Sequence, residues 1–164
     1  MSSGASEVGR AVAEDTARVL APPPLIYGGA LAVGFGIDVV LGSPHVAGGL
    51  RWGAGGTLVV AGTGLMGAFV SAFRQARTAV DPYRPTTAIV TTGPYRLTRN
   101  PGYVGMALLY GGIALTSGAL WALLPLPVAM LAIDRGVIAR EERYLERKFG
   151  SEYVAYKQRV RRWL

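Results

Sequence analysis

The chain has 164 residues, which suits one domain; 51% of them are hydrophobic and only 16% are charged, whereas a soluble globular protein carries about 25% charged residues. Cysteine is absent and His45 is the single histidine, which excludes a disulfide framework, a thiolate nucleophile and a cysteine-based metal site, so we expect no metal. The net charge is +7, but the basic residues lie beside the apolar runs and form no nucleic-acid-binding motif, so we expect a membrane protein and no nucleic-acid partner.

Residues 1–24 form a polar segment that precedes the apolar runs. Charged residues such as Glu7 and Arg10 interrupt it, and it ends in three consecutive prolines. A secretory signal peptide has a basic start, a short apolar core and a small-residue cleavage site, and this segment does not follow that pattern. We therefore expect it to lie in water or on the membrane surface.

Residues 25–73 contain two apolar runs that predict two membrane spans. Residues 25–41 are interrupted only by Asp38, and residues 52–73 carry no charge. Both runs have the length of about 17–25 residues that a helix needs to cross a bilayer. An acid inside a span is costly, so Asp38 either serves function or reaches the far interface. Gly64 begins a row of small residues at four-residue spacing, which permits close packing of a neighbouring helix.

Residues 74–100 are expected to connect the second and third spans. Gly93 lies in a segment of turn composition, and Asn100 before Pro101 has the pattern of a helix N-cap followed by proline at the first helical position. The free N–H groups at this helix start could receive an anion, with Arg99 beside them. From the residues alone, a capped membrane helix with arginines at the membrane boundary is the simpler interpretation.

Residues 101–133 carry no charge and are too long for one ordinary span. Two spans that turn near Gly118 fit this length, and Pro125 and Pro127 should bend or break the second of them. Together with the runs in residues 25–73, this predicts an all-α integral membrane protein with about four transmembrane helices; three is the fallback.

Residues 134–164 predict a helical tail that follows the last span. The segment contains good helix formers and no proline, and Gly150 is a candidate C-cap or break between two helices. Arginine and lysine are concentrated in this tail and in residues 74–100, so the positive-inside rule places the tail, the loop and both termini in the cytoplasm. Taken alone, Glu141 and Glu142 are explained by a solvated helix face.

Two segments together resemble one family of membrane enzymes. Residues 93–105 are similar to its R-H/N-P-x-Y-x-G motif, and residues 141–156 are similar to its E-E…F-G…Y…Y tail. The two motifs lie in the family's order, on either side of a membrane hairpin, and the resemblance covers roughly residues 82–162. The family is that of the isoprenylcysteine carboxyl methyltransferases, with their bacterial and phospholipid methyltransferase relatives. It implies a multi-helix membrane fold that holds S-adenosylmethionine at the cytoplasmic side.

The resemblance also implies a cofactor pocket. By position, its residues are Gly93, Pro94, Tyr95, Arg99, Asn100, Tyr103, Glu141 and Glu142. Helix N-terminal amides, an asparagine and an arginine can hold the cofactor's carboxylate, a glutamate can accept hydrogen bonds from its amino group or ribose, and tyrosine faces can lie against its adenine or sulfonium.

The candidate catalytic residues are Glu141, Glu142, Arg135 and Arg140. Either arginine could hold the carboxylate of an acceptor, and either glutamate could take a proton from an acceptor amine or thiol. The sequence leaves these alternatives open. Methyl transfer would leave S-adenosylhomocysteine as the product.

We therefore expect a membrane methyltransferase that uses S-adenosylmethionine and acts on a hydrophobic or lipid-linked acceptor carrying a carboxylate, amine or thiol. Asn100 stands where the eukaryotic carboxyl methyltransferases have histidine, which separates this chain from enzymes that methylate a prenylated cysteine. The alternative is a non-enzymatic helical membrane protein that binds lipid or a partner subunit; it predicts that the Arg99 and Glu141 groups lie apart. A transporter ranks last, because no internal repeat is evident.

Overall fold

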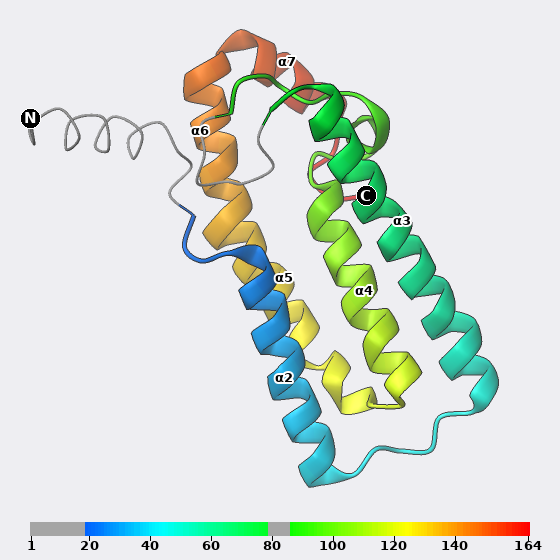
Figure 1. Cartoon of the computed structure of the whole chain (residues 1–164). Helices are drawn as coiled ribbons and strands as arrows, with labels where there is room; N and C mark the ends of the chain where they lie inside the picture. Colours follow the sequence, from blue (N-terminus) through cyan, green and yellow to red (C-terminus); the bar gives the residue numbers. More distant parts are fainter. Residues whose placement is uncertain (1–18, 79–85) are drawn as a thin grey trace, which may run out of the picture.

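The computed structural model describes residues 19–78 and 86–164 (Figure 1). Most of the polar segment expected at residues 1–24, and residues 79–85 of the expected connecting loop, lie outside the described residues. Within the described part, the chain forms helices and loops and no strand. The all-α fold class predicted from the sequence is confirmed.

The helices follow one another as a bundle that is extended at one end by a tail. The four bundle helices are α2 (Pro23–Leu41), α3 (Gly56–Gln75), α4 (Pro101–Ser117) and α5 (Pro125–Ile133). The tail helices are α6 (Ala139–Phe149) and α7 (Ser151–Arg159). Four short helical turns complete the described elements: η1 (Gly49–Gly55), η2 (Gly93–Arg96), η3 (Leu120–Leu123) and η4 (Asp134–Ile138).

Three helical stretches are long and apolar enough to cross a membrane: Pro23–Leu41, Gly49–Gln75 and Leu120–Phe149. The third bundle helix, α4, is also apolar but has only 17 residues, which is the short end of the range for a span. It buries more of its residues than α2, α3 or α5 does. The helix count thus agrees with the predicted number of about four.

Small residues let α3 and α4 approach closely. A Cβ atom on Gly62 would lie 2.9 Å from the carbonyl oxygen of Gly105, and one on Gly112 would lie 2.7 Å from Val59 Cγ2. Gly64, where the sequence pattern permitted such a contact, faces open space instead. Lipid tolerates glycine on a helix surface, so a row of small residues does not by itself reveal which face meets the neighbouring helix.

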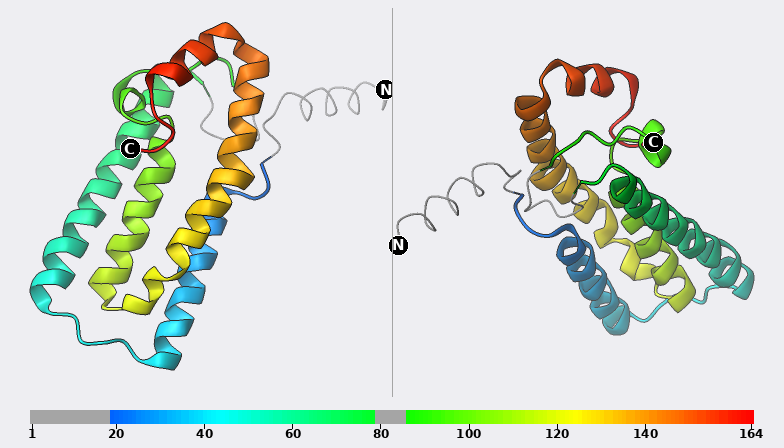
Figure 2. Two further views of the ribbon diagram at one scale, coloured as in Figure 1. Left: turned by 180° about the vertical axis from the view of Figure 1, so that it is seen from behind. Right: turned by 45° about the horizontal axis from the view of Figure 1, so that its top comes forward.

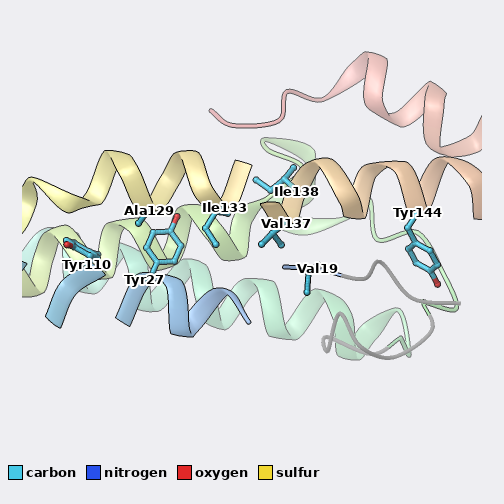
Figure 3. Close-up of a cluster of buried hydrophobic side chains, with 8 residues drawn as sticks. All are labelled: Val19, Tyr27, Tyr110, Ala129, Ile133, Val137, Ile138 and Tyr144. Atoms are coloured by element: carbon cyan, nitrogen blue, oxygen red, sulfur yellow. The ribbon is translucent and has the colours of Figure 1, made fainter. Parts of the chain in front are cut away.

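A hydrophobic cluster joins α2 and α4 to the rod formed by α5, η4 and α6 (Figure 3). The rings of Tyr27 and Tyr110 meet edge to face with their centroids 6.5 Å apart, and Ile133 and Val137 are completely buried. The rod is continuous because the π-helical turn η4 connects α5 directly to α6. This packing fixes where the charged residues at the start of α6 lie.

The end of the bundle beyond Leu41 and Ser117, termed the far end, is closed by polar contacts to backbone groups. Asp38 accepts hydrogen bonds from the Ser43 hydroxyl and from the backbone N–H of Trp121, the latter at 3.2 Å. Arg51 donates to the carbonyl of Thr116 at 2.9 Å. Of the two interpretations of Asp38, the structure therefore favours the one in which it reaches the far interface, where it takes up a free amide of η3.

The predicted helix boundaries in the second half of the chain agree with the structure. Gly118 ends α4 in the left-handed conformation with φ 78°, so the chain turns where the sequence predicted. Pro125 starts α5 one residue after the 3-10 turn η3, so the helix type changes where the prolines predicted a bend or break. Gly150, with φ 55°, separates α6 from α7.

Candidate active site

A cavity of about 390 Å³ lies between α3, α4 and α6, at the end opposite the far end. We call this the site end. Cavities of about 300–1,000 Å³ are the size that small-molecule ligands occupy. Most of the lining is apolar, and six polar lining residues were predicted from the sequence: Tyr95, Arg99, Asn100, Tyr103, Glu141 and Glu142.

The six predicted residues come from three separate parts of the chain. Tyr95 lies in η2, Arg99 and Asn100 precede α4, Tyr103 lies in its first turn, and the two glutamates lie in the first turn of α6. The tail brings these parts together, because α7 and the segment after it pass back over the start of α4 (Figure 2). The Arg99 and Glu141 groups therefore converge, which contradicts the separation that the non-enzymatic alternative predicted.

Glu142 is buried with 5% of its surface exposed, and cations surround it. Arg99 Nη2 donates to its Oε1 at 2.7 Å, Arg162 donates to both of its carboxylate oxygens, and Lys157 Nζ lies 3.9 Å from Oε2. A buried carboxylate is stable only when it is paired in this way. The same ion pair raises the pKa of Arg162 above its usual value. Glu142 is thus occupied by the protein's own groups.

Arg99 binds mainly to the tail. Its Nη1 donates to the carbonyl oxygens of Lys157 at 2.7 Å and Val160 at 2.8 Å, and its Nη2 donates to Glu142. Its Nε–H is buried and has no hydrogen-bond partner within the described part of the chain. An unpaired buried donor costs free energy, so this atom is a candidate contact for a ligand.

Glu141 differs from its neighbour in its partners. Its Oε1 accepts a hydrogen bond from the Tyr103 hydroxyl at 2.8 Å, and this is its only hydrogen bond among the described residues. No arginine or lysine is paired with it there, although it lines the cavity. The acid therefore retains acceptor capacity for a ligand that is a cation or a hydrogen-bond donor.

Asn100 starts α4 without capping it through its side chain. Its side-chain Nδ2 donates to the backbone carbonyl of Arg162 at 2.8 Å. Its backbone carbonyl accepts hydrogen bonds from the backbone N–H groups of Tyr103 and Val104, both at 3.1 Å. Asn100 is thus the N-cap residue before Pro101, as predicted, but its side chain makes no capping hydrogen bond and its amide nitrogen binds the segment after α7 instead. Asn100 still lines the cavity, together with Arg99.

Aromatic side chains form one wall of the cavity. Tyr95 packs against Phe69 and Phe73 at centroid distances of 6.4 and 5.9 Å, and Tyr153 lies 6.0 Å from Tyr156. Burial raises the pKa of Tyr95 well above its usual value and that of Tyr156 to about 12, so both phenols are neutral at physiological pH. Tyr156 uses its hydroxyl to donate to the carbonyl of Tyr95 at 2.8 Å.

Four of the predicted residues are not among the described lining of the cavity: Gly93, Pro94, Arg135 and Arg140. Gly93 and Pro94 open η2, where a φ of 59° requires glycine and sets the turn that carries Tyr95. Arg135 is exposed and Arg140 is half-buried. The catalytic roles predicted for the two arginines stay predictions.

Sequence reasoning did not identify Asp134 and Arg162 as part of the site. Arg162 Nη1 donates to Asp134 Oδ2 at 3.2 Å, while its other nitrogens bind Glu142. Both residues appeared as ordinary charges of a basic tail. No local pattern links positions so far apart, and only the return of the chain over α4 brings them into contact.

The fold and the cavity define a class: an integral membrane protein in which apolar helices carry, at one end, a largely apolar cavity with buried charged side chains in its lining. Comparison of the chain with known protein families identifies its family. The model of the phospholipid methyltransferase family matches residues 50–152, and the chain belongs to this family. The matched region contains the helices that carry Tyr103 and Glu141.

Two further comparisons describe how far known proteins resemble this chain. An uncharacterized protein of Haemophilus influenzae is 47% identical over 62 residues, which make up 38% of this chain and 98% of that protein. No solved structure matches the chain significantly. The family membership implies methyltransferase activity in a membrane.

Proposed function

We propose that this protein is a membrane methyltransferase that uses S-adenosylmethionine and methylates a hydrophobic or lipid-linked acceptor. The observation that carries the proposal is the unequal pairing of two adjacent acids. Glu142 is neutralised by Arg99 and Arg162, whereas Glu141 has only a phenol as its partner among the described residues. A cavity that holds an acid without a cation suits a ligand that supplies positive charge.

The residues present fit this cofactor by the chemistry of their free groups. The amino-acid end of S-adenosylmethionine carries a carboxylate and an ammonium, and its sulfonium is a second cation. Arg99 supplies a buried donor without a partner, and Glu141 supplies an acceptor without a cation. The faces of Tyr95 and Tyr153 offer a surface for an aromatic base or a cation.

The chain's own contribution is to bind, orient and shield the reactants. The bound cofactor would supply an activated methyl group for an in-line displacement. Transfer of this kind depends mainly on positioning, so the packed walls of the cavity account for much of the expected rate enhancement. Glu141 is the acid best placed to accept a proton from an amine or thiol acceptor, because Glu142 already binds two arginines.

The apolar part of the lining supports a hydrophobic acceptor. Met66, Phe69, Val70 and Phe73 of α3 and Met106 of α4 line the cavity. These side chains belong to helices of the apolar bundle, so the apolar part of the cavity continues into the membrane region. This apolar wall offers a contact surface for an acceptor that dissolves in lipid.

We also propose that the site end faces the cytoplasm. Arginine is frequent in the tail and in the segment before α4, and many of these side chains, such as Arg96, Arg143 and Arg159, are exposed. The far end carries Arg51 alone among the basic residues described there, and its guanidinium binds Thr116. By the positive-inside rule this asymmetry favours a cytoplasmic site end.

Calorimetric titration of the detergent-solubilised protein with S-adenosylmethionine tests the proposal. We expect saturable binding that Glu141→Gln weakens about 10- to 100-fold, because a hydrogen bond to a charged group is lost. Asp38→Asn, at the far end, is the matched control and should leave the affinity unchanged. A second measurement follows the labelled methyl group into a total lipid extract.

The outcome of the titration separates the proposal from the non-enzymatic alternative. Binding that both variants retain, or no binding to the wild-type protein, contradicts use of this cofactor at this site. Binding of lipid alone by the wild-type protein would instead favour the non-enzymatic membrane protein.

A further inference from the structure

The chain after α7 lies extended across the start of the third bundle helix. This 160–164 segment leaves α7 at Val160, whose φ of −124° and ψ of 134° are extended. Arg99 N–H donates to the carbonyl of Arg161 at 2.9 Å, and the carbonyl of Arg162 accepts from the Thr98 hydroxyl at 3.0 Å. These contacts to backbone carbonyls fix the segment in register against residues 98–100, of which Arg99 and Asn100 line the cavity.

The side chain of Arg162 then joins two acids that the sequence separates. Its Nε and Nη2 approach the two oxygens of Glu142, and its Nη1 lies 3.3 and 3.2 Å from the two oxygens of Asp134. A guanidinium that donates two hydrogen bonds to one carboxylate fixes the orientation of that carboxylate and also compensates its charge. A lysine ammonium compensates the charge but does not fix the orientation in this way. Trp163 Nε1 also donates to Asp134 at 2.9 Å, which secures the same segment.

Glu142 is therefore held from two sides. Arg99 approaches Oε1 from the start of α4, and Arg162 approaches from the 160–164 segment. Glu141 and Glu142 are consecutive residues of α6. The contacts that hold Glu142 therefore also fix the part of the helix backbone from which the Glu141 side chain projects. Arg162 itself does not line the described cavity, and its side chain is 33% exposed.

We propose that Arg162 is a positioning residue of this site: it orients Glu142 and thereby sets Arg99 and Glu141 for the ligand. This inference rests on the proposed function and assigns part of the cofactor affinity to a residue that does not touch the cofactor. The ion pairs explain how Arg162 would act. Removal of the Arg162 guanidinium would leave part of the buried Glu142 carboxylate unpaired, and the side chain would shift toward another partner.

The experiment is a titration of purified protein with S-adenosylmethionine and, separately, with S-adenosylhomocysteine. Arg162→Ala should weaken binding of the first roughly 100-fold, because a small displacement of binding groups has effects of this order. Arg162→Lys keeps the charge without the two-pronged grip and should weaken binding about tenfold. Arg161→Ala, the neighbouring exposed arginine, is the matched control and should bind like the wild-type protein.

Two measurements separate positioning from general stability. The unfolding temperature of each variant is recorded, and Arg162→Lys should keep that of the wild-type protein while losing affinity. The double variant Arg162→Ala with Glu142→Gln should bind S-adenosylmethionine no more weakly than the single variant with the lower affinity, because both changes disrupt the same ion pair. Additive losses would overturn the inference.

The remaining outcomes distinguish the two proposals. If the wild-type protein binds and both Arg162 variants bind equally well, the positioning role is wrong while the proposed function stands. If the wild-type protein binds neither ligand, the proposed function fails and the positioning role fails with it. An equal loss in Arg161→Ala would also contradict the inference, because it would show a general effect of positive charge.

Discussion

The two ends of the bundle contain the same kinds of residue in opposite situations. At the far end, Asp38 and Arg51 each bind a backbone group: the Trp121 N–H of η3 and the Thr116 carbonyl of α4, respectively. At the site end, Glu141 faces a cavity and has a single phenol as its partner among the described residues. An acid near the end of a membrane helix is thus structural or functional according to what satisfies it, and its position alone does not decide.

The site end contains both situations side by side. Glu142 resembles Asp38, since the protein's own groups satisfy it fully, whereas Glu141 keeps free acceptor capacity. We therefore propose separate roles for these two consecutive acids: Glu142 holds the structure around the cavity, and Glu141 is available to a ligand. Substitutions at the two ends test this division directly.

The largest effect is expected for Glu142→Gln. The change leaves Arg99 and Arg162 close together without their shared anion, and loss of one member of a buried ionic cluster costs about 3–5 kcal/mol. We expect a marked decrease in the free energy of unfolding and weakened cofactor binding. Denaturant unfolding in detergent measures the first; a stability equal to that of the wild-type protein would contradict the structural role of Glu142.

A smaller effect is expected for Tyr103→Phe, which removes the hydroxyl that donates to Glu141. One hydrogen bond contributes about 0.5–1.5 kcal/mol, so cofactor affinity should change by less than about tenfold while the fold is retained. Titration calorimetry checks the affinity. Tyr27→Phe serves as the control, because its hydroxyl donates to the Tyr103 carbonyl and not to the acid.

The smallest effect on the site is expected for Asp38→Asn at the far end. The amide oxygen still accepts from the Trp121 N–H, so the free energy of unfolding should fall by no more than about 1 kcal/mol. Cofactor affinity should be unchanged. A loss of affinity comparable to that in Glu141→Gln would break the contrast between the two ends and would return Asp38 to the functional residues.

Much of the fold could be predicted from local patterns. Uncharged runs gave the spans, Gly118 and Gly150 gave the turns, and Asn100 with Pro101 gave the start of α4. These features depend on neighbours in the sequence, so one sequence is enough to predict them. Which small-residue row of α3 faces α4 was not determined, since Gly62 and Gly64 have the same local chemistry.

The candidate site was predictable only in part. The motifs around Arg99 and Glu141 identified groups that do line one cavity, although their roles are still proposals. The pairing of Glu142 with Arg162 and the use of the Asn100 amide by the 160–164 segment depend on the chain returning over α4. Such long-range contacts leave no spacing pattern, so the sequence did not separate the two glutamates.

Photo-crosslinking with labelled S-adenosylmethionine, followed by peptide mass analysis, tests the central claim most directly. The account predicts label in peptides that contain Tyr95, Tyr103 or Glu141, competition by unlabelled cofactor, and strongly reduced label in Glu141→Gln. Asp38→Asn should be labelled like the wild-type protein. Label confined to the far end, or unchanged labelling of Glu141→Gln, would contradict the assignment of the cofactor site.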